Sequence, residues 1–294
     1  MNTKSIILSA ISLLILGCNK METTDAPSEG AMSFTVDYPA TKATETAFEA
    51  GDRIGVYITA YENGKPLELQ LGGNFKNNNP VVFDGTKWTA DPVIYWNDKI
   101  EKYNVFAYYP ICEPSSVDEM PFSVKLDQGI EETTERLSSY EASDFLYASQ
   151  KGVTEADGNV NLLFKHKMSK LTVNLLKGED FEGEIPAEMT IYIHNTVTDC
   201  LIDLSTGDVI KDPYAPAKTI TTKRIDEDTY TAIVVPQMIT NQKPMLEIIF
   251  KDVSYMIERK FQFKTGMHHV LNVTLNNNAD KVKVEIGGEI EGWN

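Results

Sequence analysis

The sequence predicts an all-β protein made of two antiparallel β-sandwich domains in tandem. Its apolar residues recur in short runs rich in Val, Ile, Tyr and Phe, which are typical of strands. Turn-forming dipeptides separate many of these runs. The length of 294 residues exceeds what one hydrophobic core usually supports, so two domains of ordinary size are expected.

The chain opens with an export signal. Lys4 precedes the only long apolar run, residues 5–17, which is too short to cross a bilayer as a helix. Gly17 then precedes Cys18, and a small residue before a cysteine is the lipobox arrangement, in which the thiol receives a diacylglyceryl group. We therefore predict a signal peptide at 1–17 and a lipid anchor on Cys18. A plain signal peptide followed by a chance cysteine is the alternative.

After the anchor, residues 18–30 are polar and aperiodic, which predicts a flexible tether. Strand patterns follow at residues 33–37, 54–58, 81–83, 103–109 and 171–175. Turn pairs that tolerate positive φ stand at 63–64, 84–85, 157–158 and 287–288. Only residues 131–140 have a helix-like composition, and a loop is equally consistent with them.

The polar interval at Asp157–Gly158 is the best candidate for a domain boundary. A strand-rich block ends at Ala148, and another begins at Val160. We therefore place the N-terminal domain at 31–155 and the C-terminal domain at 156–294.

Charge and cysteine content narrow the range of partners and cross-links. The net charge of −16 makes nucleic acid and anionic lipid surfaces poor partners. Beyond Cys18, only Cys112 and Cys200 remain, which is too few for a disulfide framework. We expect two buried thiols, and a single bridge between the domains is the alternative.

The residues give no positive sign of catalysis. His268 and His269 are adjacent in a predicted strand and so point to opposite faces, while His166 and His194 have no partner at ligand spacing. The sequence contains no hydrolase, zinc or phosphate-loop motif. A glycoside hydrolase would need two carboxylates across a cleft, and none of the 43 acids can be assigned to such a pair. We therefore predict that the protein is not an enzyme and has no metal or cofactor.

Aromatic residues crowd one part of the first domain. They are Trp88, Tyr95, Trp96, Tyr103, Phe106, Tyr108 and Tyr109. Alternation places Phe106 and Tyr108 on one face of their strand, with Val105, Ala107 and Tyr109 on the other. These rings are expected to fill the core of a sandwich. The alternative is an exposed platform on which sugars stack, which would make the chain a lipid-anchored carbohydrate-binding protein.

Several phrases, taken together and in order, resemble the fimbrillin-like family of Bacteroidetes-type surface lipoproteins. They lie at residues 48–57, 93–96, 105–110, 144–148, 160–171, 230–237 and 266–275. The resemblance runs from the lipobox to Trp293. It implies two transthyretin-like β-sandwich domains and a structural role in adhesive fimbriae at the cell outer membrane.

In this family the precursor travels as a lipoprotein, and an outer-membrane-associated protease cuts after a basic residue in the loop behind the first strand. The cut removes that strand and opens a groove, which the C-terminal strand of another subunit then fills. The resemblance therefore implies that the partners are other fimbrial subunits and a processing protease. Adhesion adds a receptor or glycan that the residues do not identify.

The residues of this chain fit that scheme with one departure. The removed first strand would carry Phe34 and Val36 on one face, and Lys42 is the only basic residue in the small, polar loop behind it. We therefore predict cleavage of the Lys42–Ala43 bond, although an Arg-specific protease of the kind known in the family would not cut there. An ordinary surface lysine is the alternative.

At the other end of the chain, Val282, Val284 and Ile286 alternate with charged residues, and Ile290 and Trp293 follow. This pattern suits a donor strand, and it suits a terminal edge strand equally well.

Overall fold

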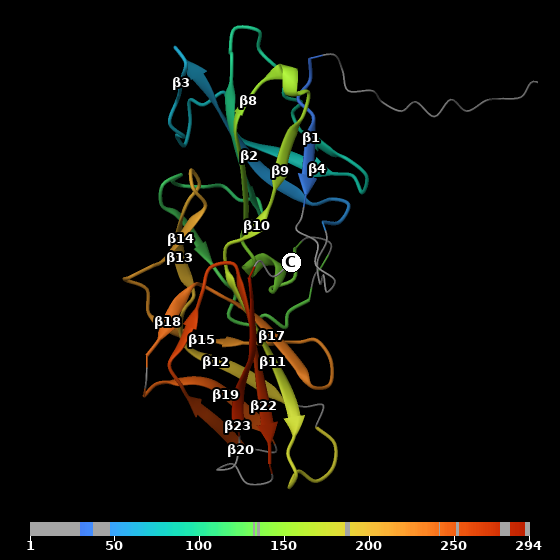
Figure 1. The fold of residues 1–294 in the computed structure, drawn as a ribbon, viewed down its shortest axis with the longest axis vertical. Helices are drawn as coiled ribbons and strands as arrows, with labels where there is room; N and C mark the ends of the chain where they lie inside the picture. Colours follow the sequence, from blue (N-terminus) through green and yellow to red (C-terminus); the bar gives the residue numbers. More distant parts are fainter. Residues whose placement is uncertain are drawn as a thin grey trace, which may run out of the picture.

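The computed structural model describes residues 30–37, 48–131, 133, 136–185, 189–240, 242–250, 253–276 and 283–291. Strands dominate these ranges, and the helices within them are two single 3₁₀ turns, η1 (Glu141–Ser143) and η2 (Glu155–Asp157). The all-β prediction is confirmed. In the described ranges, no helix is long and apolar enough to cross a membrane. The strands form two parts that follow one another along the long axis of the molecule (Figure 1).

The upper part in Figure 1 is one sheet in the order β10-β8-β6-β2-β4-β5-β1-β9, with β3 paired to β2. Its strands are β1 (Phe34–Asp37), β2 (Arg53–Glu62), β3 (Lys65–Pro66), β4 (Lys76–Phe83), β5 (Trp88–Ala90), β6 (Tyr103–Tyr109), β8 (Leu146–Val153), β9 (Val160–Leu163) and β10 (Lys165–His166).

This sheet curls so that strands from both ends of its order enclose one hydrophobic core. Ile54 and Val56 of β2 contribute to that core together with Phe34 of β1 and Leu162 of β9. β1 pairs in parallel with β9, which is the one parallel pairing in the described part of this sheet. The core therefore includes a strand that lies near the start of the described residues.

The lower part contains two facing sheets. One has the order β16-β17-β11-β22-β23 and the other β15-β12-β19-β20. Their strands are β11 (Ser169–Lys177), β12 (Thr190–Val197), β15 (Ala217–Thr221), β16 (Lys223–Arg224), β17 (Thr229–Val234), β19 (Pro244–Phe250), β20 (Val253–Glu258), β22 (Met267–Leu275) and β23 (Lys283–Glu291). Leu171 and Val173 of the first sheet and Ile191 and Ile193 of the second belong to one buried cluster, as expected of a sandwich.

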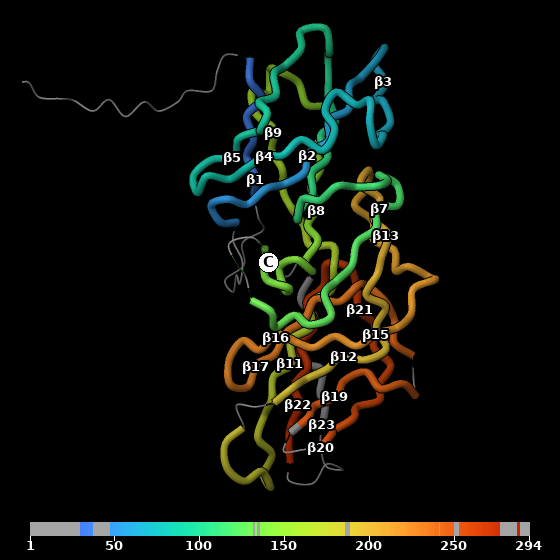
Figure 2. The backbone as a smooth tube through the Cα atoms, turned by 180° about the vertical axis from the view of Figure 1, so that it is seen from behind, coloured from blue at the N-terminus to red at the C-terminus, as the bar shows by residue number. Residues whose placement is uncertain are grey.

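Two small sheets complete the fold. β14 (Asp208–Lys211), β13 (Asp199–Asp203) and β7 (Met120–Ser123) form one, while β18 (Gln237–Ile239) and β21 (Phe261–Phe263) form the other. Figure 2 shows β7 beside β13 at the junction of the two parts. The buried cluster of the lower part extends across this junction to Tyr57 and Tyr108 on the outer face of the upper sheet.

The division at 155/156 stays a prediction, and several strand pairings cross it. β9 and β10 follow the proposed boundary yet pair with β1 and β8 of the upper sheet, and β7 precedes it yet pairs with β13. The polar Asp157–Gly158 pair closes the single turn of η2, with Gly158 at φ 69°, and returns the chain to the same sheet. A polar turn signal therefore marks a tight reversal here.

Two of the other predicted turns had different outcomes. Asn63 and Gly64 both have positive φ and join β2 to β3 as a tight hairpin, as predicted. Gly287 and Gly288, in contrast, lie within β23, where the ladder with β22 shifts register. That prediction of a turn was wrong, because a pair of glycines also suits a β-bulge.

Candidate functional site

The first strand occupies an internal position in the upper sheet. On one side, Phe34 of β1 lies opposite Trp88 of β5, and the preceding Ala31 bridges to Tyr95. On the other side, β1 runs in parallel register with β9 from Phe34 opposite Val160 to Asp37 opposite Leu163. Backbone hydrogen bonds from Val160 N to Ser33 O (2.8 Å) and from Met32 N to Ile94 O (2.8 Å) fix both edges of the segment.

Side chains of this segment cover the core of the upper sheet. Met32 and Phe34 are 5% and 7% exposed, and Val36 is half-buried against the same cluster, whereas Thr35 and Asp37 are exposed. Beneath them lie Ile94, Val160, Leu162 and Phe164, which are all fully buried. Phe34 and Val36 therefore share the inward face, and the core residues below depend on them for cover.

Three of the predicted processing residues lie outside the described ranges: Cys18, Lys42 and Ala43. β1 ends at Asp37 and β2 begins at Arg53, so residue 42 falls between these two strands in the sequence. Arg53, the next basic residue after Lys42, is the first residue of β2 and pairs with Val82 of β4 in the sheet.

The C-terminal strand β23 forms an edge of the five-stranded sheet, antiparallel to β22. Val284 lies opposite Val273 and Ile286 opposite Leu271, and both partners in β22 are completely buried. Val282 and Trp293 lie outside the described residues. The predicted donor segment therefore pairs, in this structure, with a strand of its own chain.

A register shift divides β23 into two pieces. The shift falls between Val270 and Leu271 of β22, opposite the two glycines. Beyond it, Ile290 lies opposite His268, which is on the other side of β22 from the buried row of His269, Leu271 and Val273. A Cβ on Gly287 would stand 2.9 Å from Asn272 Nδ2, so a larger residue at this position would require the Asn272 side chain to shift.

The aromatic cluster of the first domain is mostly core. Trp88, Tyr103, Phe106 and Tyr108 are at most 9% exposed, and Trp96 and Tyr109 are partly buried against the upper core. Of the seven rings only Tyr95, at 53%, is exposed. The prediction that these rings fill a core is confirmed, and the alternative of an exposed sugar platform is contradicted. The rings on both faces of β6 are covered, on one side by the core of the upper sheet and on the other by the buried cluster that extends from the lower part.

His194 belongs to a hydrogen-bonded row that crosses the whole four-stranded sheet. Its Nδ1 is 2.9 Å from Thr219 Oγ1 of β15, and its Nε2 is 2.7 Å from Glu247 Oε2 of β19. Ser254 of β20 donates to the other oxygen of Glu247. The bonds from Ser254 and His194 hold the pKa of Glu247 below its ordinary value.

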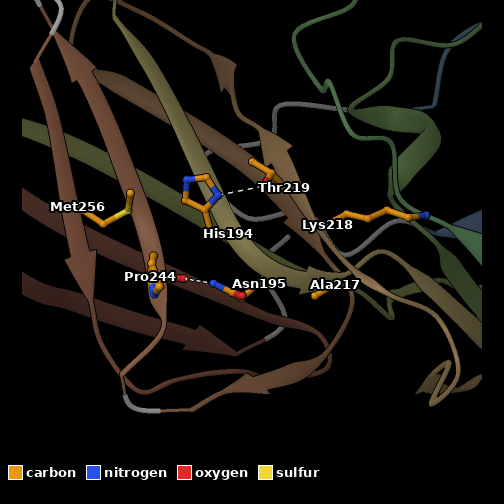
Figure 3. A pocket seen from close by; sticks show the side chains of 7 residues that line it. All are labelled: His194, Asn195, Ala217, Lys218, Thr219, Pro244 and Met256. Atoms are coloured by element: carbon orange, nitrogen blue, oxygen red, sulfur yellow. Dashed lines mark hydrogen bonds between the residues drawn. The ribbon is translucent and has the colours of Figure 1, made fainter.

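A pocket of about 200 Å³ opens beside this row, lined by His194, Asn195, Ala217, Lys218, Thr219, Pro244 and Met256. Figure 3 shows His194 between Thr219 on one side and Met256 on the other. The ammonium group of Lys218 pairs with Asp199 Oδ2 at 2.8 Å. The row therefore joins side chains of neighbouring strands on the wall of a small pocket.

The other histidines are held by nearby groups. His166 Nδ1 is 2.7 Å from the carboxylate of Asp144 in a buried position, and His268 Nε2 is 2.8 Å from Thr172 Oγ1. His269 is buried, so His268 and His269 do lie on opposite faces. Sequence reasoning missed the carboxylate partners Asp144 and Glu247, because they are distant in the sequence. Within the described ranges no cluster of three or more His, Cys, Asp or Glu residues could hold a metal ion.

Cys112 and Cys200 are free thiols. Cys200 is buried as expected, and burial raises its pKa to about 12. Cys112 is exposed, contrary to the prediction of two buried thiols. It follows the β6 strand in a loop, where its carbonyl accepts hydrogen bonds from Tyr108 and Asn78.

The chain resembles proteins of Bacteroides along most of its length. It is 25% identical over 313 residues to a candidate fimbrium subunit, Fim1C, of Bacteroides uniformis, covering 100% of this chain and 96% of the relative. It is 29% identical over 175 residues to a candidate fimbrium tip subunit, Fim1C, of Bacteroides ovatus. That match covers 54% of this chain and spans only 31% of the Bacteroides ovatus protein.

Two solved structures share the fold. A candidate cell adhesion protein of Bacteroides uniformis has a TM-score of 0.68 at 19% identity, with 92% of this chain and 100% of the other covered. A candidate cell adhesion protein of Bacteroides ovatus has a TM-score of 0.64 at 19% identity, with 90% and 96% covered. The profile of the family described as fimbrillin-like matches residues 41–293, which is most of the sequence. The chain belongs to the fimbrillin-like family.

Proposed function

We propose that this protein is a structural subunit of a cell-surface adhesive fimbria. In this proposal it is exported as a lipoprotein on Cys18 and reaches the cell outer membrane. Cleavage at Lys42–Ala43 then releases the segment that contains β1, and a strand of a neighbouring subunit takes its place. The observation that carries the proposal is the internal position of β1 between β5 and β9.

The pairing of β1 makes it suited to exchange. It is only four residues long, and the ladder to β5 contains a single residue pair, so few backbone hydrogen bonds hold it. Its neighbours run in opposite senses, antiparallel for β5 and parallel for β9. An entering strand of either direction therefore finds one antiparallel and one parallel neighbour, and both kinds of ladder can form hydrogen bonds with it.

The face beneath β1 requires a replacement. Without Met32, Phe34 and Val36, the buried side chains of Ile94, Val160 and Leu162 would meet water. Exposure of an apolar strip beside two unpaired strand edges favours capture of another strand. Val282, Val284 and Ile286 form the alternating apolar row that such a position accepts, and the shift at Gly287 moves Ile290 out of that row.

Donation requires β23 to leave β22 first. The described part of β23 is an edge strand of the five-stranded sheet. If β23 leaves, the pairing of β11 with β22 therefore stays in place. Other fimbrial subunits and a processing protease are the partners in this scheme. The receptor or glycan that such a fimbria would recognise is a further partner.

The test is N-terminal sequencing of protein recovered from the cell surface, together with electrophoresis in SDS without heating. Subunits that begin at Ala43 and migrate as SDS-resistant multimers are expected. Lys42→Ala should abolish both results, whereas Lys65→Ala, in the exposed β3 hairpin, should change neither. A surface population that is entirely lipidated at Cys18 and monomeric would refute the polymerising subunit.

A further inference from the structure

Phe48 lies between β1 and β2 in the sequence, outside the strands, and its ring contacts residues from both neighbours of β1. The ring centroid is 4.9 Å from that of Trp88 in β5 and 5.7 Å from that of Phe164, which directly follows β9. Both contacts are edge-to-face, an arrangement that aromatic pairs prefer. Phe48 is half-buried against the core of the upper sheet, so it connects two flanking segments within one core.

The two rings that Phe48 contacts belong to residues that pair with β1. Trp88 lies opposite Phe34 in the ladder between β5 and β1. On the other flank, the backbone N–H of Phe164 donates to Asp37 O at 3.0 Å. Phe48 therefore reaches from a side chain on one flank of β1 to a side chain on the other.

The turn that follows Phe48 is anchored to strands other than β1. Gly51 N donates to the carbonyl of Phe83, the last residue of β4, at 2.8 Å. Tyr109, the last residue of β6, donates its hydroxyl to Asp52 Oδ1 at 3.2 Å, and its ring packs edge-to-face on Phe48 at 5.4 Å. Removal of β1 would therefore leave these anchors of Phe48 in place.

The strands on the two flanks of β1 can pair with each other if β1 leaves. Because β1 is antiparallel to β5 and parallel to β9, β5 and β9 run antiparallel to each other. Their freed edges could form a direct ladder by moving together by one strand spacing, about 4.8 Å. Burial of the apolar strip that β1 had covered would favour this movement. Such closure would remove the place for an incoming strand.

We propose that Phe48 is a positioning residue of the strand-accepting site. The proposed cut at Lys42–Ala43 removes β1 but leaves Phe48 in the subunit. Its ring then stays between Trp88 and Phe164 and keeps β5 and β9 far enough apart to receive one strand of a neighbouring subunit. This inference rests on the proposed function, because it concerns the subunit that has lost β1.

The experiment compares Phe48→Ala and Phe48→Tyr with the wild type by N-terminal sequencing and unheated SDS electrophoresis of surface protein. Phe48→Ala subunits should begin at Ala43, as the wild type does. The ratio of their SDS-resistant multimers to cleaved monomers should fall about tenfold, as expected for the loss of two edge-to-face contacts. Phe48→Tyr retains the ring and should assemble as the wild type does.

Phe75→Ala is the matched control. Phe75 is also half-buried against the core of the upper sheet, but its ring packs at 4.9 Å on Tyr103 of β6. In a Lys42→Ala background, which retains β1, Phe48→Ala and Phe75→Ala should lower the melting temperature by similar amounts. In the cleavable chain, Phe75→Ala should form multimers as the wild type does, because it leaves the flanks of β1 unchanged.

Phe48→Leu keeps the test decisive if Phe48→Ala does not fold. It retains an apolar side chain of shorter reach, so its share of multimers should lie below that of Phe48→Tyr. Equal multimers in Phe48→Leu and Phe48→Tyr, or an equal loss in Phe75→Ala, would overturn the inference and leave the proposed function standing. Wild-type subunits that do not begin at Ala43, or that form no multimers, would overturn both.

Discussion

Phe34 and Val160 occupy paired positions in two parallel neighbouring strands, although they stand at the two ends of the sequence that builds the upper sheet. Both side chains are buried in the same core. The first strand is thus a structural member of the sheet in this form of the protein, and its loss has a measurable energetic cost.

Phe34→Ala should lower the free energy of unfolding by about 3 kcal/mol, because it removes a large buried ring and leaves a cavity above Val160 and Leu162. Urea unfolding of the uncleaved chain measures the change. Thr35→Ala is the control in the same strand, since Thr35 is exposed, and it should stay within about 0.5 kcal/mol of the wild type. Equal losses in the two variants would show that β1 does not cover the core.

Gly55→Ala should destabilise the protein by about 1–3 kcal/mol through overpacking. A Cβ at this position would stand 2.6 Å from both Asn78 Oδ1 and Tyr108 Cε1, whose side chains are joined by a 2.7 Å hydrogen bond. Gly72→Ala is the matched control, because no heavy atom lies within 4 Å of its added Cβ. Melting temperatures of the two variants provide the comparison, and a Gly55→Ala protein as stable as Gly72→Ala would contradict the expectation.

Gln128→Glu should make stability depend on pH. A carboxylate in this fully buried position would face the carbonyl of Ile233 in place of an amide donor. Burial raises the pKa of such a glutamate above its unfolded value of about 4.3. The variant is therefore closest to the wild type below about pH 4 and loses stability as the pH rises through its folded pKa.

Thermal melting between pH 4 and 8 checks this dependence. Gln262→Glu introduces the same charge at an exposed position of β21 and should show no comparable slope. If the melting temperature of Gln128→Glu changed with pH no more than that of Gln262→Glu, the hydrogen bonds between the Gln128 side chain and the backbone of Ile233 in β17 would not contribute to stability.

Asp199→Asn should remove part of the acid sensitivity of the fold. Hydrogen bonds from Lys218 and Ser123 lower the pKa of Asp199, and they tie β13 to β15 and β7. Because its folded pKa lies below the unfolded value, its contribution is present above about pH 3.9 and is lost as the pH falls through the folded pKa. For a partly exposed pair the effect is about 1 kcal/mol or less.

Urea unfolding at pH 7 and pH 3 measures that contribution. The wild type should lose more stability on acidification than Asp199→Asn does. Asp118→Asn, at an exposed position, is the control and should lose as much as the wild type. Parallel losses in all three proteins would rule out the contribution of Asp199.

Local sequence was sufficient to predict many strands but not their partners. The run at 103–109 coincides with β6, and its alternation correctly separates Phe106 and Tyr108 from Val105 and Ala107. Strand character comes from neighbouring residues, and the sequence supplies those directly. Pairing is decided by the whole sheet, so the parallel ladder of β1 with β9 and the ladder of β7 with β13 were not predictable.

In the candidate sites, too, local sequence predicted the features of single strands but not the contacts between distant segments. Alternation predicted the inward face of Phe34 and Val36, because one strand determines it. The residues that β1 covers, and the carboxylates beside His166 and His194, come from distant strands and loops. The glycine pair at 287–288 is compatible with a turn or a bulge, and only the ladder with β22 distinguishes them.

The parallel ladder between β1 and β9 also constrains the order of folding. A chain made from its N-terminus presents residues 34–37 first, but their parallel partners at 160–163 emerge only after β2–β8. Contacts between such distant segments form slowly, because a long loop must close before they are gained. We therefore expect the first strand of this sheet to be among the last to dock, after β2, β4, β6 and β8 have paired with one another.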